Sequence, residues 1–582
     1  MPGPPSGPGN AHPRGLGRTT GGRHVLLCEL IATYLAESGP SRQFGVLGEG
    51  NLGVATALDR LGTTYHPARR EDAAVAMADG WARRTGEVGL ATVTSGPGLT
   101  NALTALREAA AHGTPLILLT ALTPRAVPHH PQNYPARAYV EATGAGYLEL
   151  ESPEQAAWAC HVVLTRAREQ QRPWVLALPQ ELLYHEVDRL LLDDALPGSL
   201  EVLGRSERRS PRPDPASTDA VSEELRASDR PMLVVGRGVV EAGCADQVAM
   251  LAERIGATVY TTLLGKGLFA GHPHHLGICG GFGHTPTGDL LAEADLVLVL
   301  GASLNPWTAM DGAILDGARL VQVDRDPEAF GRWYPPDLAV HGDVGVVVGA
   351  LLGSLADDAP RDPWWERPAA ESGPAESDLG EAGTALVTRD VAITLAGCLP
   401  TGLTIALDSG HAMADLVPRL VVEDPRRFVY AFHAGAIGLG LGMAMGASLA
   451  EPDRWTVLFT GDGALAMTLQ ELTTVARSNL PLMIVVLDDG GYGAEVHYSG
   501  VRGLPGELSE LAGPDLDAVA TAFGLDYVEA RSLAEVAAIA ELLEGAPAPT
   551  LVRVPVSSEP MNRWYEHFVA EVSPVDWTIG RD

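Results

Sequence analysis

The sequence predicts an α/β protein built from three doubly wound parallel-sheet domains. Short apolar runs alternate with segments of helical periodicity along most of the 582 residues. Such alternation is typical of parallel sheets that are covered by helices on both faces. Two polar, proline-bearing stretches interrupt the pattern, at residues 193–217 and 357–385, and we interpret them as linkers. A chain of this length accommodates three domains of about 100–200 residues each.

The first predicted domain covers residues 25–192. It follows an N-terminal arm, residues 1–24, whose proline and glycine content predicts disorder. The arm has arginines but no apolar core, so we do not expect a secretory signal. Within the domain, a helical pattern over Ala73 to Arg84 precedes the strand-like runs Leu90–Thr94 and Pro115–Thr120.

The second predicted domain, a Rossmann-like central domain, covers residues 218–356. Its strand Pro231–Val235 ends in Gly236-Arg237-Gly238, and a helical pattern follows as far as Ile255. Two further strands are expected at Leu296–Gly301 and Leu320–Asp324. This order again predicts a doubly wound sheet.

The third predicted domain covers residues 386–555 and leaves a C-terminal tail, residues 556–582. Its expected elements alternate between strand and helix. The strands are Thr404–Asp408, Thr456–Thr460 and Leu482–Leu487, and the helices are Gly438–Leu449 and Leu469–Ser478.

The composition excludes several classes of function. The 41 basic and 73 acidic residues give a net charge of −32, which argues against non-specific binding to nucleic acid or to an anionic membrane. The longest uncharged run, Phe428–Ala450, contains His433 and several glycines, so we do not expect a membrane span. The five cysteines lie far apart without a CxxC pair. They predict neither a disulfide framework nor a zinc site, and they favour a cytoplasmic location.

Acidic residues follow two of the expected strands in the third domain. The strand Thr456–Thr460 stops at Gly461-Asp462-Gly463, and the strand Leu482–Leu487 stops at Asp488-Asp489-Gly490-Gly491. Doubly wound sheets bind ligands at the carboxyl ends of their strands. Carboxylates suit Mg²⁺, and glycines let the backbone approach a ligand closely. A single Gly-Asp-Gly segment, however, most often forms only a turn.

The spacing of these two segments resembles a known cofactor motif. Gly461-Asp462-Gly463, 24 intervening residues and then a polar pair resemble the thiamine diphosphate motif of the superfamily of pyruvate decarboxylase, benzoylformate decarboxylase and acetolactate synthase. The resemblance implies that Mg²⁺ is bound by Asp462, Asp489 and the carbonyl oxygen of Gly491. One departure stands out, because the superfamily normally has Asn-Asn where this chain has Asp488-Asp489. The change adds negative charge to the expected metal site.

The first domain carries a second resemblance to the same superfamily. The segment from Arg69 to Leu103 begins with Arg69-Arg70-Glu71-Asp72 and contains Ser95-Gly96-Pro97-Gly98. It is similar to the segment that carries the superfamily's activating glutamate, with Glu71 at that position and Gly96 in the glycine turn. Taken alone, Glu71 would be a solvated acid at a helix start. The resemblance covers about residues 25–554 and implies pyrimidine-binding, central and diphosphate-binding domains in that order.

The resemblance also implies further residues around the cofactor. Ile437 matches the apolar residue that wedges between the two cofactor rings, and ordinary packing at a helix start is the alternative. Glu49, Glu495 and the pair His129-His130 match proton-transfer residues of pyruvate decarboxylase-type enzymes, but the sequence flanking the two histidines does not. The cofactor-binding residues expected in addition to the metal ligands are Gly96, Gly410, His411, Ile437, Gly461, Gly463 and Ala464.

The expected activity is decarboxylation of a 2-oxo acid followed by carboligation to an aldehyde or a second oxo acid. Two alternatives stay open: a simple decarboxylase that releases an aldehyde, and a non-catalytic member of the superfamily that acts as a binding subunit. The central domain resembles that of acetolactate synthases, which holds FAD, but Gly236-Arg237-Gly238 is too short a motif to indicate FAD here. The resemblance further implies a homodimer or homotetramer whose active sites are shared between chains.

Overall fold

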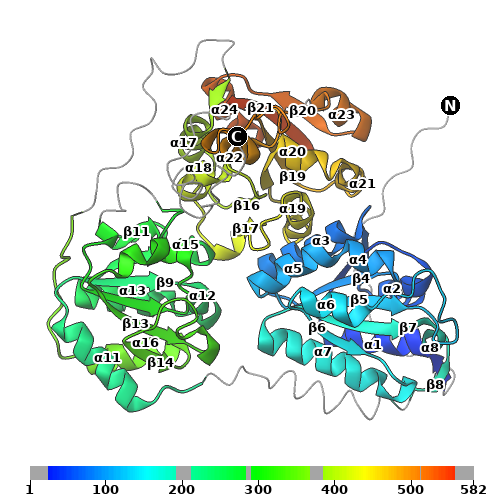
Figure 1. Cartoon of the computed structure of the whole chain (residues 1–582), viewed down its shortest axis with the longest axis horizontal. Helices are drawn as coiled ribbons and strands as arrows, with labels where there is room; N and C mark the ends of the chain where they lie inside the picture. Colours follow the sequence, from blue (N-terminus) through cyan, green and yellow to red (C-terminus); the bar gives the residue numbers. More distant parts are fainter. Residues whose placement is uncertain are drawn as a thin grey trace, which may run out of the picture.

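The computed structural model describes residues 24–189, 191, 211–283, 290–366, 385–511 and 513–557, and these form three α/β domains (Figure 1). Each domain is built on its own parallel sheet, which confirms the expected fold class. All but the last residue of the expected N-terminal arm, most of both linkers and nearly all of the C-terminal tail lie outside the described residues. Within the described ranges, no helix has the length and apolar character needed to cross a bilayer.

The N-terminal domain has a six-stranded parallel sheet in the order β3-β2-β4-β5-β7-β6. The strands are β2 Arg42–Gly45, β3 Thr64–Pro67, β4 Gly89–Val93, β5 Leu116–Leu122, β6 Gly146–Glu149 and β7 Trp174–Pro179. The helices are α1 Leu27–Ser38, α2 Glu49–Arg60, α3 Glu71–Thr85, α4 Pro97–Asn101, α5 Leu103–His112, α6 Ala136–Ala142, α7 Ala156–Gln170 and α8 Gln180–Leu183. Two short antiparallel strands, β1 His24–Leu26 and β8 Glu186–Asp188, pair beside them. The helix and the two strands expected from the sequence are confirmed as α3, β4 and β5.

The central domain has a six-stranded parallel sheet in the order β11-β10-β9-β12-β13-β14. The strands are β9 Pro231–Val235, β10 Thr258–Thr261, β11 His275–Ile278, β12 Leu296–Leu300, β13 Arg319–Asp324 and β14 Leu338–His341. The helices are α11 Pro215–Ala227, α12 Arg237–Ala242, α13 Ala245–Ile255, α15 Pro306–Ala309 and α16 Val344–Ser354. The helical pattern expected up to Ile255 is divided into α12 and α13, because Gly243 ends α12 in the left-handed conformation with φ +62°.

The C-terminal domain has a seven-stranded sheet in the order β15-β21-β19-β18-β16-β17, and β20 also pairs with β21. The strands are β15 Leu386–Val387, β16 Thr404–Leu407, β17 Phe428–Tyr430, β18 Thr456–Gly461, β19 Leu482–Asp488, β20 Asp526–Glu529 and β21 Thr550–Ser557. The helices are α17 Thr388–Cys398, α18 Met413–Arg419, α19 Gly440–Ser448, α20 Asp462–Ala466, α21 Leu472–Arg477, α22 Gly493–Val501, α23 Leu516–Phe523 and α24 Leu533–Leu542, with a 3-10 turn η7 at Leu469–Glu471. All the strands expected here are confirmed.

Helices α3 and α19 join the N-terminal and C-terminal domains, and they lie side by side where the two domains meet (Figure 1). Their buried side chains belong to one continuous apolar core. The backbones approach so closely that a Cβ atom on Gly446 would lie 1.9 Å from the carbonyl oxygen of Met77. Only glycine fits at that contact, which fixes α3, and with it Glu71 at its first turn, relative to the C-terminal domain.

Candidate active site

Four aspartates follow three neighbouring strands at one edge of the C-terminal sheet. Strands β16, β18 and β19 are neighbours and run parallel, so their carboxyl ends lie together. Asp408 follows β16, Asp462 opens α20 directly after β18, and Asp488 and Asp489 stand at the end of β19. The structure therefore brings together the two segments whose spacing suggested a metal site.

Asp462 and Asp489 are partly buried, and their charges repel each other. The Asp489 side chain is only 7% exposed. Burial, and after it the charges of Asp489 and Asp488, raise the pKa of Asp462 to about 7. Burial also raises the pKa of Asp489 above its ordinary value. Two adjacent carboxylates in such a place need either a shared proton or a bound cation.

The residues present fit a magnesium ion. The Oδ1 atom of Asp462 is buried and has no hydrogen-bond partner among the described residues, so it is free to act as a ligand. The carbonyl oxygen of Gly491 packs against this turn, because a Cβ on Gly463 would lie 3.2 Å from it. In the part of the chain that the structure describes, no three His, Cys, Asp or Glu side chains are arranged so that they could hold a metal ion by themselves. Two carboxylates and one carbonyl form a small oxygen-donor set, which suits Mg²⁺ shared with phosphate and water.

His411 lies against the same pair of carboxylates. Its Nε2 is 3.4 Å from Oδ2 of Asp489. Burial, and then the neighbouring His497, lower the pKa of His411 to about 3, so the imidazole is neutral. Gly493 makes this approach possible, because a Cβ there would lie 2.1 Å from Oδ2 of Asp489 and 2.2 Å from Cε1 of His411. No motif in the sequence indicated this role of Gly493.

Glu71 is the first residue of α3 and faces the glycine turn of the same domain. Its Oε2 accepts a hydrogen bond from Nδ2 of Asn101 at 3.0 Å. A Cβ on Gly98 would lie 3.6 Å from its Oε1, so the turn passes beside the carboxylate. Gly96 precedes α4 with φ +60°, a conformation that favours glycine. The structure thus brings the segment around Glu71 and the glycine turn together. It also places Asn101 beside Glu71, a contact that no motif in the sequence indicated.

Glu471 connects the diphosphate-type motif to the start of α3. It lies in η7, nine positions after Asp462 in the sequence, and it is fully buried. Its carboxylate accepts hydrogen bonds from the amides of Arg69, at 3.0 and 3.1 Å, and Arg70, at 2.9 Å. These two residues directly precede Glu71, so Glu471 fixes the backbone on which Glu71 stands.

We expect Glu471→Gln to change the pH dependence of stability. Burial raises the pKa of Glu471 to about 7, from an ordinary value of 4.5. The folded chain therefore binds more protons than the unfolded chain between pH 4.5 and 7, and the contribution of Glu471 to stability declines as the pH rises through that window. The glutamine variant keeps an acceptor oxygen and has no proton to lose. Its melting temperature relative to wild type should therefore rise by a few degrees between pH 5 and pH 8.

Thermal unfolding of both proteins at the two pH values checks this expectation. The matched control is Glu541→Gln, which changes an exposed glutamate of α24. Its melting temperature relative to wild type should be the same at both pH values. If the melting temperatures of Glu471→Gln and wild type differed by the same amount at both pH values, the assignment of a raised pKa to Glu471 would be contradicted.

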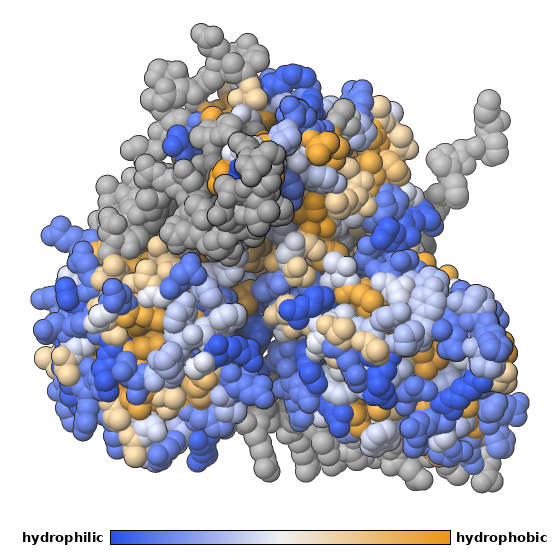
Figure 2. All heavy atoms as spheres, viewed as in Figure 1, coloured by the Kyte–Doolittle hydropathy of each residue, from blue (hydrophilic) through white to orange (hydrophobic). Residues whose placement is uncertain are grey.

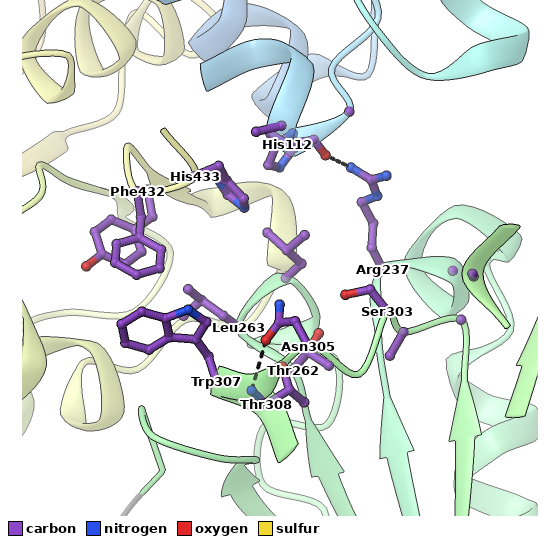
Figure 3. A pocket seen from close by; sticks show the side chains of 18 of the residues that line it. His112, Arg237, Thr262, Leu263, Ser303, Asn305, Trp307, Thr308, Phe432 and His433 are labelled. Atoms are coloured by element: carbon purple, nitrogen blue, oxygen red, sulfur yellow. Dashed lines mark hydrogen bonds between the residues drawn. The ribbon is translucent and has the colours of Figure 1, made fainter. Parts of the chain in front are cut away.

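A large cavity of about 2420 Å³ lies where the domains meet, and several predicted residues line it. Figure 2 shows a hollow between the domains at this place. Gly410, His411, Ile437 and Glu495 contribute the wall from the C-terminal domain. The central domain contributes aromatic side chains, and Figure 3 shows Trp307 close to Phe432, with ring centroids 5.7 Å apart.

Not all the predicted residues reach this cavity. Among the described residues that line it, neither Glu71 nor Glu49, His129 or His130 is found. Glu49 and His129 are exposed on the N-terminal domain, whereas His130 is partly buried and its Nδ1 accepts a hydrogen bond from the amide of Gln132 at 3.1 Å. Within one chain, the structure therefore does not bring these three residues together with Glu495.

Buried ionic contacts hold the loop that leads to Ile437. Glu108 of α5 accepts hydrogen bonds from the amide of Ala434 at 2.7 Å and from Nδ1 of His433 at 3.0 Å. Arg83 of α3 lies 3.0 Å from the same carboxylate. Burial acts to raise the pKa of Glu108, but His433 and Arg83 together lower it to about 2. This network ties the loop to the N-terminal domain, and no motif in the sequence indicated it.

Asp408 holds the other end of that loop. It is buried, and its Oδ1 accepts a hydrogen bond from the amide of Gly438 at 3.0 Å. Glu108 and Asp408 thus anchor residues 434 and 438 on either side of Ile437. The position of Asp408 at the carboxyl end of a predicted strand was a signal that could have identified it.

Three segments of the chain match the domains of one protein family. Residues 27–139 match the description "Thiamine pyrophosphate enzyme, N-terminal TPP binding domain", residues 218–351 match its central domain, and residues 408–554 match its C-terminal TPP binding domain. These matches contain both Glu71 and the Asp462–Gly491 segment.

Similar proteins are enzymes of several activities. The chain is 30% identical over 484 residues to a probable 2-ketoarginine decarboxylase of Pseudomonas aeruginosa, covering 80% of this chain and 82% of that protein. It is 26% identical over 545 residues to a sulfoacetaldehyde acetyltransferase of Roseovarius nubinhibens (87% and 88%). It is 27% identical over 519 residues to the large subunit of acetolactate synthase isozyme 3 of Escherichia coli (85% and 88%). The protein described here therefore belongs to the family of thiamine pyrophosphate-dependent enzymes.

Proposed function

We propose that this enzyme uses thiamine diphosphate and Mg²⁺ to decarboxylate a 2-oxo acid and to join the remaining acyl unit to a second carbonyl compound. The partly buried pair Asp462 and Asp489 at the ends of adjacent strands carries the proposal, because Oδ1 of Asp462 has no hydrogen-bond partner among the described residues. The names of two relatives, a synthase and an acetyltransferase, support the joining step. The relatives named above are all enzymes, which gives the non-catalytic alternative no support.

Each half of the cofactor would meet one set of residues. Asp462, Asp489 and the carbonyl of Gly491 would hold the cation that binds the diphosphate, with amides near Gly410, His411 and Ala464 assisting. Glu71 would hydrogen-bond the pyrimidine ring and hold a proton at its carboxylate, a charge-assisted bond of about 1.5–3 kcal/mol. The bound cofactor supplies the electron sink for decarboxylation. Ile437, anchored on both sides, would support the bent shape of the cofactor.

A simple decarboxylase is the second candidate, and the position of Glu495 favours it. Glu495 lies on α22 and lines the large cavity together with Ile437, where it could donate a proton to a product carbon. The name of the Pseudomonas aeruginosa relative supports the same outcome. The two candidates differ only in whether the acyl unit receives a proton or a second carbonyl compound.

We further propose that the enzyme is a homodimer or homotetramer with shared sites. The cavity beside Ile437 has Gly410, His411 and Glu495 in its lining, whereas Glu71, Asp462 and Asp489 of the same chain are not among the described residues that line it. A partner copy would supply Glu71 to this cavity, along with Glu49 and the two histidines. The five free thiols, four of them buried, support a reducing compartment such as the cytoplasm.

A substrate screen tests the proposed reaction. A panel of 2-oxo acids, alone and paired with aldehydes, would be incubated with the enzyme, thiamine diphosphate and Mg²⁺, with CO₂ release measured and the products identified by mass spectrometry. Coupled products that appear only with both cofactors support the carboligase, and free aldehydes support the simple decarboxylase. CO₂ release that is unchanged when thiamine diphosphate is omitted would contradict both.

Substitutions of Asp489 test the metal site. We expect Asp489→Asn to keep cation and cofactor binding, because the amide oxygen remains a ligand and the repulsion of Asp462 is removed. Asp489→Ala should weaken cofactor binding by at least about tenfold, since a ligand oxygen is lost. Calorimetric titration of each variant with thiamine diphosphate in Mg²⁺ measures the difference. Equal, normal affinity for wild type and both variants would remove Asp489 from the site.

A further inference from the structure

Asp488, the other residue that departs from the expected Asn-Asn pair, has an arginine as its partner. Arg553 of β21 donates from Nε to Oδ2 of Asp488 at 2.5 Å. The other Asp488 oxygen, Oδ1, accepts the amide of Gly490 at 3.3 Å. The Asp488 and Arg553 side chains are 16% and 31% exposed, so their ion pair is shielded from water for much of its surface. Both oxygens of Asp488 are therefore engaged within the protein.

The two consecutive aspartates have different surroundings. Side chains at successive positions of a strand point to opposite faces, and Asp488 is the last residue of β19. Asp489 lies beside His411, whereas Asp488 lines a separate small cavity of about 200 Å³ together with Asp462 and Arg553. Arg553 thus stands beside the cation site and holds the carboxylate that the site does not use.

Arg553 offsets part of the negative charge around the cation site. When ionised, the three aspartates at positions 462, 488 and 489 carry three negative charges in total. Arg553 contributes one positive charge. Glu529, the other partner of Arg553 at 2.5 Å, is itself paired with Arg531 at 2.8 Å. One divalent cation would then neutralise the two remaining charges, so that a diphosphate meets a neutral site. Without Arg553, a negative charge would remain there.

We infer that Arg553 is a positioning residue for the cation site. It holds Asp488 as its own counter-ion, keeps that carboxylate out of the ligand set, and removes the repulsion that Asp488 would exert on the diphosphate. The inference rests on the proposed function, because it presupposes that Asp462 and Asp489 bind the cation. It explains how this chain accommodates two aspartates where the resemblance implies two asparagines.

Metal and cofactor titrations of Arg553→Gln test the inference. Mn²⁺ alone, measured by the electron paramagnetic resonance signal of the free ion, should bind this variant at least about fivefold more tightly, because Asp488 is released towards the cation. Thiamine diphosphate, titrated by calorimetry in saturating Mn²⁺, should bind about tenfold more weakly, a change of about 1.4 kcal/mol. Asp488→Asn added to Arg553→Gln should return both affinities to within about twofold of wild type.

The matched control is Arg477→Gln, which removes an exposed arginine at the end of α21 and should change neither affinity by more than about twofold. If Arg553→Gln does not fold, Asp488→Asn alone gives the opposite test: it leaves Arg553 beside the site and should weaken Mn²⁺ binding about fivefold. Unchanged affinities in Arg553→Gln or Asp488→Asn, equal effects of Arg477→Gln and Arg553→Gln, or no reversal in the double variant would overturn the role of Arg553. Equal Mn²⁺ affinity of wild type and Asp462→Ala would instead overturn the proposed cation site.

Discussion

Asp462→Ala is expected to abolish binding of thiamine diphosphate at any practical concentration. The aspartate supplies the one buried, unpartnered carboxylate oxygen of the site, and the cation that it binds would carry the diphosphate. Removing one partner of a buried charge pair costs about 3–5 kcal/mol, which corresponds to a loss of roughly 10²–10³-fold or more in affinity. Calorimetric titration with thiamine diphosphate in Mg²⁺ measures this loss.

Two controls separate the loss of a ligand from the loss of the fold. Because burial and repulsion raise the pKa of Asp462, its removal should not lower the melting temperature of the cofactor-free protein. Asp390→Ala removes another buried carboxylate of the same domain, on α17, and should leave cofactor affinity within about twofold of wild type. Wild-type affinity that is unaffected by EDTA would contradict the metal-bridged site.

Glu71→Gln is expected to reduce turnover by about 10²–10⁴-fold, the range typical of a lost proton-transfer group. The glutamine keeps the size of the side chain and can still hydrogen-bond, so cofactor affinity should change by no more than about tenfold. The exchange of the cofactor's C2 proton with solvent, followed by NMR after acid quench, should slow in parallel with turnover. This readout depends on Glu71 and not on substrate binding.

The neighbouring Asp72 provides the matched control for Glu71. It lies in the same first turn of α3, is paired with Arg70 at 3.0 Å and has no role in the proposed site. Asp72→Asn should keep turnover and proton exchange within about threefold of wild type. If Glu71→Gln exchanged the C2 proton at the wild-type rate, Glu71 would not be the activating group.

The sequence predicted those features that depend on local patterns. Apolar runs and helical periodicity identified the three sheets, and the ends of two runs identified the Asp462 and Asp489 turns. The division of α12 from α13 was not predicted, because one glycine in an amphipathic pattern does not by itself specify a break. The helical pattern that begins near Ala73 also indicated that Glu71 lies at the start of a helix.

The supporting contacts could not be predicted, because their partners are distant in the sequence. Arg553 and Asp488 are 65 positions apart, Glu471 and Arg70 are 401 apart, and His433 and Glu108 are 325 apart. Each pair forms only when separate strands or domains pack together, and no short motif encodes it. The expected grouping of Glu49, His129 and His130 with Glu495 is a related case, since a single chain does not bring them together.

The central claim is that Glu71 and Asp462 serve one cofactor from two different chains, and a mixing experiment tests it most directly. Glu71→Gln and Asp462→Ala chains, each inactive alone, would be co-expressed with different affinity tags, and the mixed dimers purified by both tags. Each mixed dimer should have one intact site, built from the unaltered Glu71 of one chain and the unaltered Asp462 of the other. Its cofactor-dependent turnover should therefore approach half that of wild type, whereas purified mixed dimers without activity would contradict the shared site.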